Sequence, residues 1–320
     1  MEIMMKQKPQ KKRYPLNQCR LYKCNSKKKL ESILKLNSGE LAKIDSIIKY
    51  HSFQIDKKSG NEKRDISAPD DSLKKLQSRI LRLLQYVERP EWLISGEKGK
   101  CYIDNGKAHL KNTYMLALDI KKLYDNCQRN MVYMFFKNKM LNSSDVAKAL
   151  TDIVTYQSGI PTGCPTSQMI AYYAYEDMFN EIFDISRKYN CLFTLYVDDM
   201  MFSSKSPFDP QKIVREIELT LRKYGHRLKL PKVKYYSRKD NKPITGTIVT
   251  RDHTLEVPNS LQGKIYNGFQ KAKHDERKNT EEIQTLLGRV QAAANINPNR
   301  FTEIRRLTPK LAQKSKFAMQ

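Results

Sequence analysis

The sequence has no long apolar run, and its few cysteines form no metal-binding or disulfide pattern. No stretch of about 18 apolar residues is present, as a membrane-spanning helix would need, and no apolar signal-peptide segment follows the basic first residues. Only Cys19 and Cys24 of the six cysteines are close together, and no second Cys or His pair completes a zinc site. We therefore expect reduced thiols, no disulfide bonds and a cytoplasmic protein.

Acidic residues are scarce relative to basic ones. The 320 residues include 59 Lys and Arg but only 34 Asp and Glu, which gives a formal net charge of +25. So large an excess predicts a polyanionic partner, for which nucleic acid is the first choice and an anionic membrane surface the alternative. Basic side chains are dense in residues 1–13 and again in residues 260–320, and we expect both segments to contact nucleic acid.

The pattern of apolar residues predicts a chain that mixes helices with strands. Helical spacing of apolar residues predicts a helix over 73–87 and a long helix over 167–189, and the chain beyond Pro258 is expected to be helical. Apolar segments bounded by turn residues predict strands. The predicted strands are residues 51–55 and 64–68, joined as a basic hairpin by a turn at 59–61, and residues 114–118 and 192–195.

Two adjacent acids lie inside one of these apolar regions. Tyr196-Val-Asp-Asp199 is flanked by β-prone residues, which predicts a strand, a tight turn and a returning strand with Asp198 and Asp199 at the tip. Neighbouring carboxylates repel each other unless they share a cation. The pair therefore indicates a divalent-metal site for phosphoryl transfer. The alternative is an ordinary polar turn, in which Asp is common.

A third acid, Asp119, directly follows the strand predicted at 114–118. Three carboxylates are enough to hold two Mg²⁺ ions about 3.5–4 Å apart, because Mg²⁺ keeps several of its waters. Such a pair of ions stabilises both the attacking and the leaving oxygen of an in-line displacement, and Mn²⁺ could replace Mg²⁺. The alternative for Asp119 is the N-cap of a following helix.

Turn residues are concentrated between residues 158 and 168. Pro161, Gly163 and Pro165 predict an irregular loop, and Gly163 would let the backbone approach a ligand closely. Ser167 is in a position to cap the helix that follows. The alternative is a connector that happens to contain turn residues.

These motifs occur in the order and spacing of a known family, because the chain resembles the reverse transcriptases. Asp119-Ile-Lys-Lys-Leu-Tyr124 resembles the first palm motif of that family, Pro161–Ser167 its loop beneath the incoming nucleotide, and Tyr196–Asp199 its catalytic box. Thr162 replaces the usual Gln of the loop. The resemblance covers roughly residues 30 to 310.

Two further motifs narrow the resemblance to the bacterial retron reverse transcriptases. Asn105-Gly-Lys-Ala-His109 is similar to an Asn-Ala-x-x-His signature, with Gly for Ala, and Ile244-Thr-Gly246 is similar to a Val-Thr-Gly signature, with Ile for Val. Val197 replaces the usual retron Ala of the catalytic box. The resemblance implies a bacterial enzyme that copies part of its cognate structured noncoding RNA into branched, RNA-linked single-stranded DNA (msDNA), in defence against phage.

The resemblance also implies a fold and a set of site residues. The fold is α+β, a right-hand polymerase with a basic N-terminal extension and fingers over 1–112, a palm with an antiparallel sheet packed on helices over 113–255, and a basic helical thumb over 256–320. Tyr124 would be the steric gate that selects dNTPs. The implied residues are Asp119, Asp198 and Asp199 as metal ligands and catalytic groups, Lys63, Arg64, Tyr124, Thr162, Gly163 and Lys234 at the nucleotide, and Asn105, His109, Thr245 and Gly246 in RNA recognition.

The expected partners are the cognate RNA and its RNA–DNA product, dNTP substrates and a separate effector protein, with no membrane. One alternative is a reverse transcriptase of another bacterial lineage, related to abortive-infection or group II intron enzymes. The other is a non-catalytic RNA-binding scaffold, against which the three acids argue.

Overall fold

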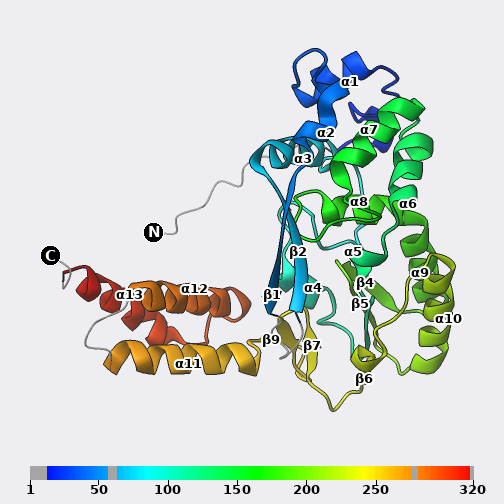
Figure 1. Cartoon of the computed structure of the whole chain (residues 1–320). Helices are drawn as coiled ribbons and strands as arrows, with labels where there is room; N and C mark the ends of the chain where they lie inside the picture. Colours follow the sequence, from blue (N-terminus) through cyan, green and yellow to red (C-terminus); the bar gives the residue numbers. More distant parts are fainter. Residues whose placement is uncertain (1–12, 57–62, 275–279, 318–320) are drawn as a thin grey trace. The chain divides into compact units, whose positions relative to one another are not determined.

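The computed structural model describes residues 13–56, 63–274 and 280–317 (Figure 1). The chain forms two compact units. Residues 1–12 of the basic arm expected over 1–13, and the predicted turn at 59–61, lie outside the described residues. The first unit comprises residues 1–98, 120–185 and 215–228, and the second comprises 99–119, 186–214 and 229–320. The boundaries given above for fingers, palm and thumb stay a prediction.

The first unit is mainly helical, with one β-hairpin. Its core contains fully buried side chains such as Ile80, Phe136 and Leu150. The helix α3 begins where Asp70 caps it, since the Asp70 carboxylate accepts a hydrogen bond from the Leu73 backbone N–H at 3.0 Å. The elements are α1 (Lys27–Leu34), α2 (Ile44–Ile47), β1 (Tyr50–Asp56), β2 (Lys63–Pro69), α3 (Asp71–Leu84), α5 (Leu123–Asn126), α6 (Arg129–Met134), α7 (Ser144–Val154) and α8 (Ser167–Ala174), with α9 (Glu176–Lys188) and α10 (Pro210–Lys223) crossing its boundaries. Short 3₁₀ turns occupy Leu16–Gln18 and Glu40–Lys43, and a π-helical turn occupies Phe135–Lys139.

The second unit contains the sheet in which the predicted acids lie. Its strands are β3 (Tyr114–Asp119), β4 (Leu192–Tyr196), β5 (Asp199–Ser204) and β6 (Lys234–Tyr236), in the antiparallel order β4-β5-β3-β6. Apolar residues of β3 and β5 are buried, which explains why a continuous apolar sequence forms these central strands. A second sheet contains β7 (Lys242–Ile244), β8 (Thr247–Val249) and β9 (Leu255–Glu256); α4 (Tyr102–Ala108) and the 3₁₀ turn Leu230–Lys232 complete this part.

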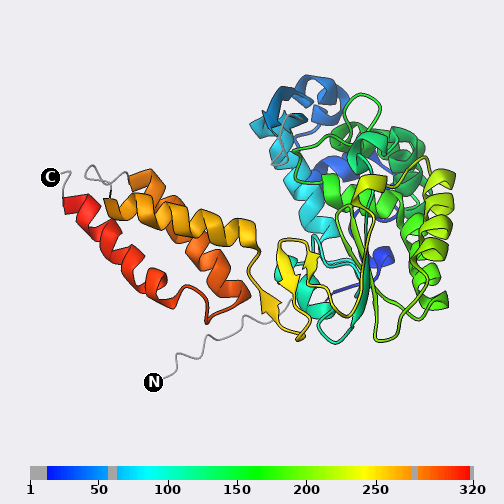
Figure 2. The ribbon, with the colours of Figure 1, turned by 90° about the horizontal axis from the view of Figure 1, so that it is seen from below.

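Three helices end the chain and form the helical segment expected after Pro258. They are α11 (Asn259–His274), α12 (Thr280–Ile296) and α13 (Thr302–Phe317). Figure 2 shows them side by side, in yellow-orange to red, and Ile265, Leu286 and Val290 are buried among them. Among the described residues, no helix is both long and apolar enough to cross a membrane.

The structure differs from two local expectations. The helix predicted over 167–189 is interrupted at Tyr175, whose N–H is shared between the carbonyls of Ala171 and Tyr172 and whose hydroxyl accepts a hydrogen bond from the Gln128 N–H at 2.9 Å. Ser167 does not cap α8, because its hydroxyl donates to the Pro161 carbonyl at 2.6 Å. The first difference involves a contact with a residue 47 positions earlier, and the second a contact within the preceding loop. The predicted hairpin and strands are confirmed.

Candidate metal centre and nucleotide-binding elements

The β4–β5 hairpin places Asp198 and Asp199 next to Asp119. Tyr196 pairs with Asp199 across the hairpin, so Val197 and Asp198 form its two-residue loop. Asp199 also pairs with Asp119 on the neighbouring strand β3. Val197 has a φ of 61°, a left-handed conformation that costs a β-branched residue on the order of 1–3 kcal/mol. Backbone strain is therefore located at the tip that holds the acids.

The three carboxylates form one compact cluster. One oxygen from each of Asp119, Asp198 and Asp199 lies within 4.8 Å of the other two. Asp119 is buried, and the pKa of Asp199 is raised to about 6 by desolvation, and further by the negative charges of Asp198 and Asp119. An all-oxygen, negatively charged donor set suits a hard divalent cation such as Mg²⁺ or Mn²⁺. The residues present therefore fit a divalent metal, and Asp119 is not the cap of a helix.

One cation, Lys232, lies in this cluster. Its ammonium forms an ion pair with the Asp119 carboxylate. Desolvation alone would lower the pKa of Lys232, but the hydrogen bond to Asp119 and the charges of the three acids raise it overall. Lys234, the lysine predicted to lie near the pyrophosphate, is exposed on β6, where it pairs with Ala117. The sequence contains no signal that shows which of these two lysines, only two residues apart, lies beside the acids.

The other predicted nucleotide contacts lie in the first unit. Lys63 and Arg64 are exposed on β2. The loop at 158–168 is bound to the base of that strand, because the Ser67 N–H donates to the Thr162 carbonyl at 2.8 Å. Gly163 has a φ of 114°, and a Cβ there would lie 2.9 Å from Ile66. A glycine is therefore required at 163 for the loop to reach the hairpin.

Tyr124 is half-buried on the short helix α5, also in the first unit. The carbonyls around this helix approach Gly159 closely: a Cβ at Gly159 would lie 2.9 Å from the Cys127 carbonyl. Gly159 therefore has to be a glycine for this turn to pack beside α5. The gate role of Tyr124 stays a prediction.

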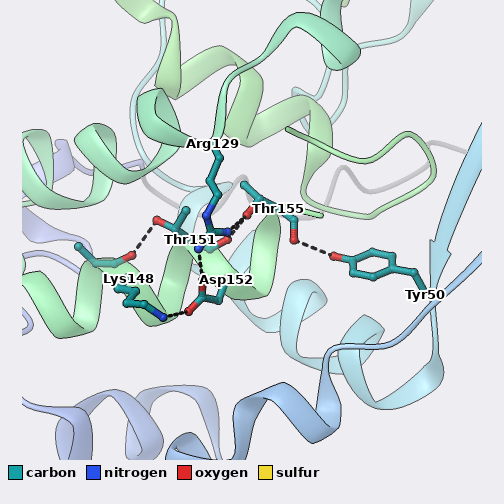
Figure 3. A network of polar contacts seen from close by, with 7 residues as sticks. Tyr50, Arg129, Lys148, Thr151, Asp152 and Thr155 are labelled. Atoms are coloured by element: carbon teal, nitrogen blue, oxygen red, sulfur yellow. Dashed lines mark hydrogen bonds and ion pairs between the residues drawn. The ribbon is translucent and has the colours of Figure 1, made fainter. Parts of the chain in front are cut away.

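A polar network that the sequence did not suggest supports the start of the loop (Figure 3). Arg129 on α6 pairs with Asp152 and donates to the Thr155 hydroxyl, while Lys148 pairs with the same Asp152 carboxylate at 3.0 Å. The Tyr50 hydroxyl donates to the Thr155 carbonyl at 3.4 Å. These contacts join α6, α7 and β1 just before residue 158.

The four residues predicted for RNA recognition come together in the second unit. Asn105 and His109, on and just after α4, are 0% exposed, and Asn105 donates a hydrogen bond to Thr245. Thr245 and Gly246 form the tight turn between β7 and β8. The buried side chains of Asn105 and His109 therefore cannot contact RNA directly. Their role in RNA recognition stays a prediction, and it would have to act through residues that they position.

The family is shown by comparison with known proteins. Residues 55–249, more than half of the chain, match the family described as reverse transcriptase (RNA-dependent DNA polymerase). The chain belongs to this family. The predicted α+β, reverse-transcriptase-like fold is thereby confirmed, together with the antiparallel sheets described above.

Individual relatives point to one branch of the family. The retron Se72 reverse transcriptase of Salmonella heidelberg (strain 579083-10) is 26% identical over 196 residues, which cover 59% of this chain and 52% of the relative. The retron Ec83 reverse transcriptase of Escherichia coli is 23% identical over 248 residues, or 73% of this chain and 79% of the relative. The chain thus spans about half the length of the Salmonella relative, and the resemblance to retron reverse transcriptases is confirmed.

A solved structure overlaps with the chain in part. It is the foamy viral protease-reverse transcriptase in complex with double-stranded DNA, which is 16% identical with a TM-score of 0.48. The overlap covers 85% of this chain and 41% of that protein.

Proposed function

We propose that this protein is the RNA-directed DNA polymerase of a retron, which extends a DNA strand from dNTPs along its cognate noncoding RNA. The observation that carries the proposal is the cluster of Asp119, Asp198 and Asp199 in a chain that belongs to the reverse transcriptase family. The excess of 59 Lys and Arg over 34 Asp and Glu supports a nucleic-acid substrate. The relatives, which are named as retron enzymes, support the retron assignment.

The three carboxylates would hold the divalent metal, with Mg²⁺ as the expected ion and two ions as the expected number. When bound, the metal supplies positive charge to the attacking 3′-oxygen and to the departing pyrophosphate. The residues themselves bind and align. Asp119 and Asp199, on paired strands, provide a rigid base, and Asp198 in the loop provides the third oxygen donor. Little proton transfer by side chains is needed.

Other residues would select and hold the nucleotide. Lys63 and Arg64 on the exposed hairpin are suited to offset triphosphate charge, and Gly163 lets the loop backbone come close to its neighbours. Lys232 already balances carboxylate charge, since it pairs with Asp119, and we therefore prefer it to the exposed Lys234 as the lysine that offsets pyrophosphate charge. Tyr124 would exclude a ribose 2′-hydroxyl.

The finer retron activity follows from the same assignment. The product would be msDNA, a DNA strand joined to its RNA, and the protein would act in antiphage defence with a separate effector. Sequencing the nucleic acid that copurifies with the protein tests this part. A single RNA covalently joined to DNA is the expected result, and a diverse set of unlinked RNAs would instead favour another reverse-transcriptase lineage.

The central test is primer extension on an RNA template with dNTPs and Mg²⁺. Asp198→Asn keeps the shape of the side chain but removes a charge, so extension should fall by several orders of magnitude while RNA binding persists. Extension at the wild-type rate would refute the assignment.

In the same assay, Tyr124→Val should raise ribonucleotide incorporation relative to dNTPs, and an unchanged ratio would show that Tyr124 is not the gate.

A further inference from the structure

Six polar side chains form one continuous line of hydrogen bonds inside the second unit. The His109 ring lies between two hydroxyls, with Nδ1 2.6 Å from Ser203 Oγ and Nε2 2.7 Å from Thr194 Oγ1. Thr194 donates to Asn105 Oδ1 at 2.6 Å, and Asn105 Nδ2 donates to Thr245 Oγ1 at 2.9 Å. At the other end, Asn112 Nδ2 donates to Ser203 Oγ at 2.7 Å.

The line ends on a carboxylate of the metal centre. The Thr245 hydroxyl faces the Asp199 carboxylate and, as a hydrogen-bond donor, lowers its pKa. Asp199 is an acceptor, so Thr245 must donate its one hydroxyl hydrogen to it. The line therefore connects the interior of the unit to one of the three acids.

Hydrogen counting fixes the direction of every bond. Each hydroxyl has a single hydrogen, and Thr194 gives its hydrogen to Asn105, so Thr194 must accept from the His109 Nε2–H. Burial lowers the pKa of His109 to about 3, so the ring is neutral and Nδ1 is free to accept from Ser203. All the donors thus point the same way, from Asn112 toward Asp199, and aligned hydrogen bonds polarise and strengthen one another.

The last member of the line is held in an unfavourable backbone conformation. Thr245 has a φ of 40°, in the left-handed region that β-branched residues avoid, and Gly246 follows with a φ of 83°. Gly or Asn would fit position 245 of this two-residue turn without strain. A strained residue is retained where its side chain has a task, and here the side chain offers a hydroxyl between Asn105 and Asp199.

The backbone packing brings Asn105 on α4 close to the turn that carries Thr245. Gly106 follows Asn105 on α4, and a Cβ at this position would overlap with the Thr247 hydroxyl on β8. The missing side chain lets α4 lie directly against β8, which places Asn105 within hydrogen-bond distance of the turn.

From these contacts we propose that the line from Asn112 through His109 and Asn105 orients the Asp199 carboxylate for metal binding, with Thr245 as the positioning residue that contacts it. The proposal rests on the proposed function, in which Asp199 is a metal ligand. It assigns a task to the retron-like signatures at 105–109 and 244–246 that does not require them to touch RNA. A hydroxyl that holds one carboxylate oxygen leaves the other oriented toward the cation.

The first test measures Mn²⁺ binding to the full chain by electron paramagnetic resonance, without nucleotide or template. Thr245→Gly removes the hydroxyl and relieves the backbone strain, so the variant should fold yet bind Mn²⁺ about 10-fold more weakly. Thr245→Ser keeps the hydroxyl and with it the orientation of the Asp199 carboxylate. Its Mn²⁺ affinity should therefore stay within about twofold of wild type.

A second pair of variants acts at a distance from the metal. Thr194→Val removes the donor to Asn105 Oδ1, which frees the Asn105 amide to turn over and present its oxygen to Thr245. The Thr245 hydrogen would then point to Asn105 and leave Asp199. Mn²⁺ binding should weaken in Thr194→Val and recover in Thr194→Ser.

Thr247→Val is the matched control, because Thr247 is a buried threonine of the same hairpin whose hydroxyl donates to the Ile244 carbonyl and lies outside the line. Its Mn²⁺ affinity should match wild type. Wild-type Mn²⁺ binding by Thr245→Gly and Thr194→Val, or equal weakening by Thr247→Val, would overturn the proposal. Primer extension by the wild-type protein tests the proposed function separately, so loss of one conclusion does not remove the other.

Discussion

Two groups of buried charge in this chain are balanced in opposite ways. In the first unit, Glu97 pairs with Arg89 at 2.5 Å, both side chains are 1% exposed, and Arg13 adds a second cation. In the second unit, three carboxylates form a cluster in which, among the residues that the structure describes, one cation forms an ion pair: Lys232, whose side chain is 51% exposed and pairs with Asp119. In the first group, the negative charge of Glu97 is fully compensated by arginines of the protein itself. The second retains an excess of negative charge that only a bound cation would balance.

The difference separates a structural ion pair from a site prepared for a ligand. A buried pair stabilises only while both partners are present, and it performs no chemistry. The acidic cluster instead carries repulsion, which raises the pKa of Asp199, and strained backbone at Val197 and Thr245. Unfavourable features that concentrate at one place indicate that the fold tolerates them for binding or catalysis.

The largest expected effect breaks the balanced group. Glu97→Ala leaves the Arg89 guanidinium buried without its carboxylate, so the free energy of unfolding should fall by about 3–5 kcal/mol. Chemical denaturation measures this change. Asp125→Ala is the control, because Asp125 pairs with Lys122 across 4.0 Å on the surface and should cost less than about 0.5 kcal/mol. Equal losses of unfolding free energy in the two variants would show that the buried pair is no more important for stability than the surface pair, and would contradict this account.

An intermediate effect should appear in the pH dependence of the metal-free protein. The pKa of Asp199 is about 6 in the folded chain against an ordinary 3.8, so the folded state binds its proton more tightly. The resulting stabilisation is complete below about pH 4 and is lost as pH rises through about 6. As pH rises from about 4 to about 6, the unfolding free energy of the wild type in EDTA should therefore fall by about 1–3 kcal/mol relative to that of Asp199→Asn. Denaturant titrations across this window measure it, and a difference independent of pH would refute it.

The smallest effect concerns the lone cation of the acidic cluster. Lys232→Gln removes the charge that offsets Asp119, so the unfolding free energy in EDTA at pH 8 should fall by about 0.5–1 kcal/mol, a small value because the lysine is half exposed. Lys234→Gln, two residues away and exposed on β6, should have no measurable effect on stability. The reverse order would show that Lys234 is the lysine of the site.

Local sequence was sufficient for the elements that place the acids. Alternation and apolar runs correctly predicted the strands ending at Asp119 and preceding Asp198, because most side chains of both strands are buried or half-buried, although only β3 is central and β4 lies at the edge of the sheet. Spacing alone could not distinguish Lys232 from Lys234, since a 3₁₀ turn immediately before β6 decides which lysine faces the acids. Which lysine faces the acids depends on where this one turn ends, and no local sequence pattern predicts that point.

Long-range contacts account for the remaining differences. Asn105 and His109 are polar residues in a polar segment, and their complete burial follows from the hydroxyls of Thr194 and Ser203 on strands some ninety positions later. The break at Tyr175 depends in the same way on Gln128. Asn105 and His109 carry a sequence signal only through the family motif they resemble, and Tyr175 and Gln128 carry none.

The unfolding free energies of wild type and Asp199→Asn, measured at pH 8 in EDTA and again in excess Mg²⁺, test the central claim most directly. Without metal, the variant should be the more stable protein, because it lacks the repulsion between neighbouring carboxylates. With Mg²⁺, the order should reverse, because only the wild type gains the full free energy of metal binding. The same order of stability in both conditions would contradict the assignment of this cluster as a divalent-metal site.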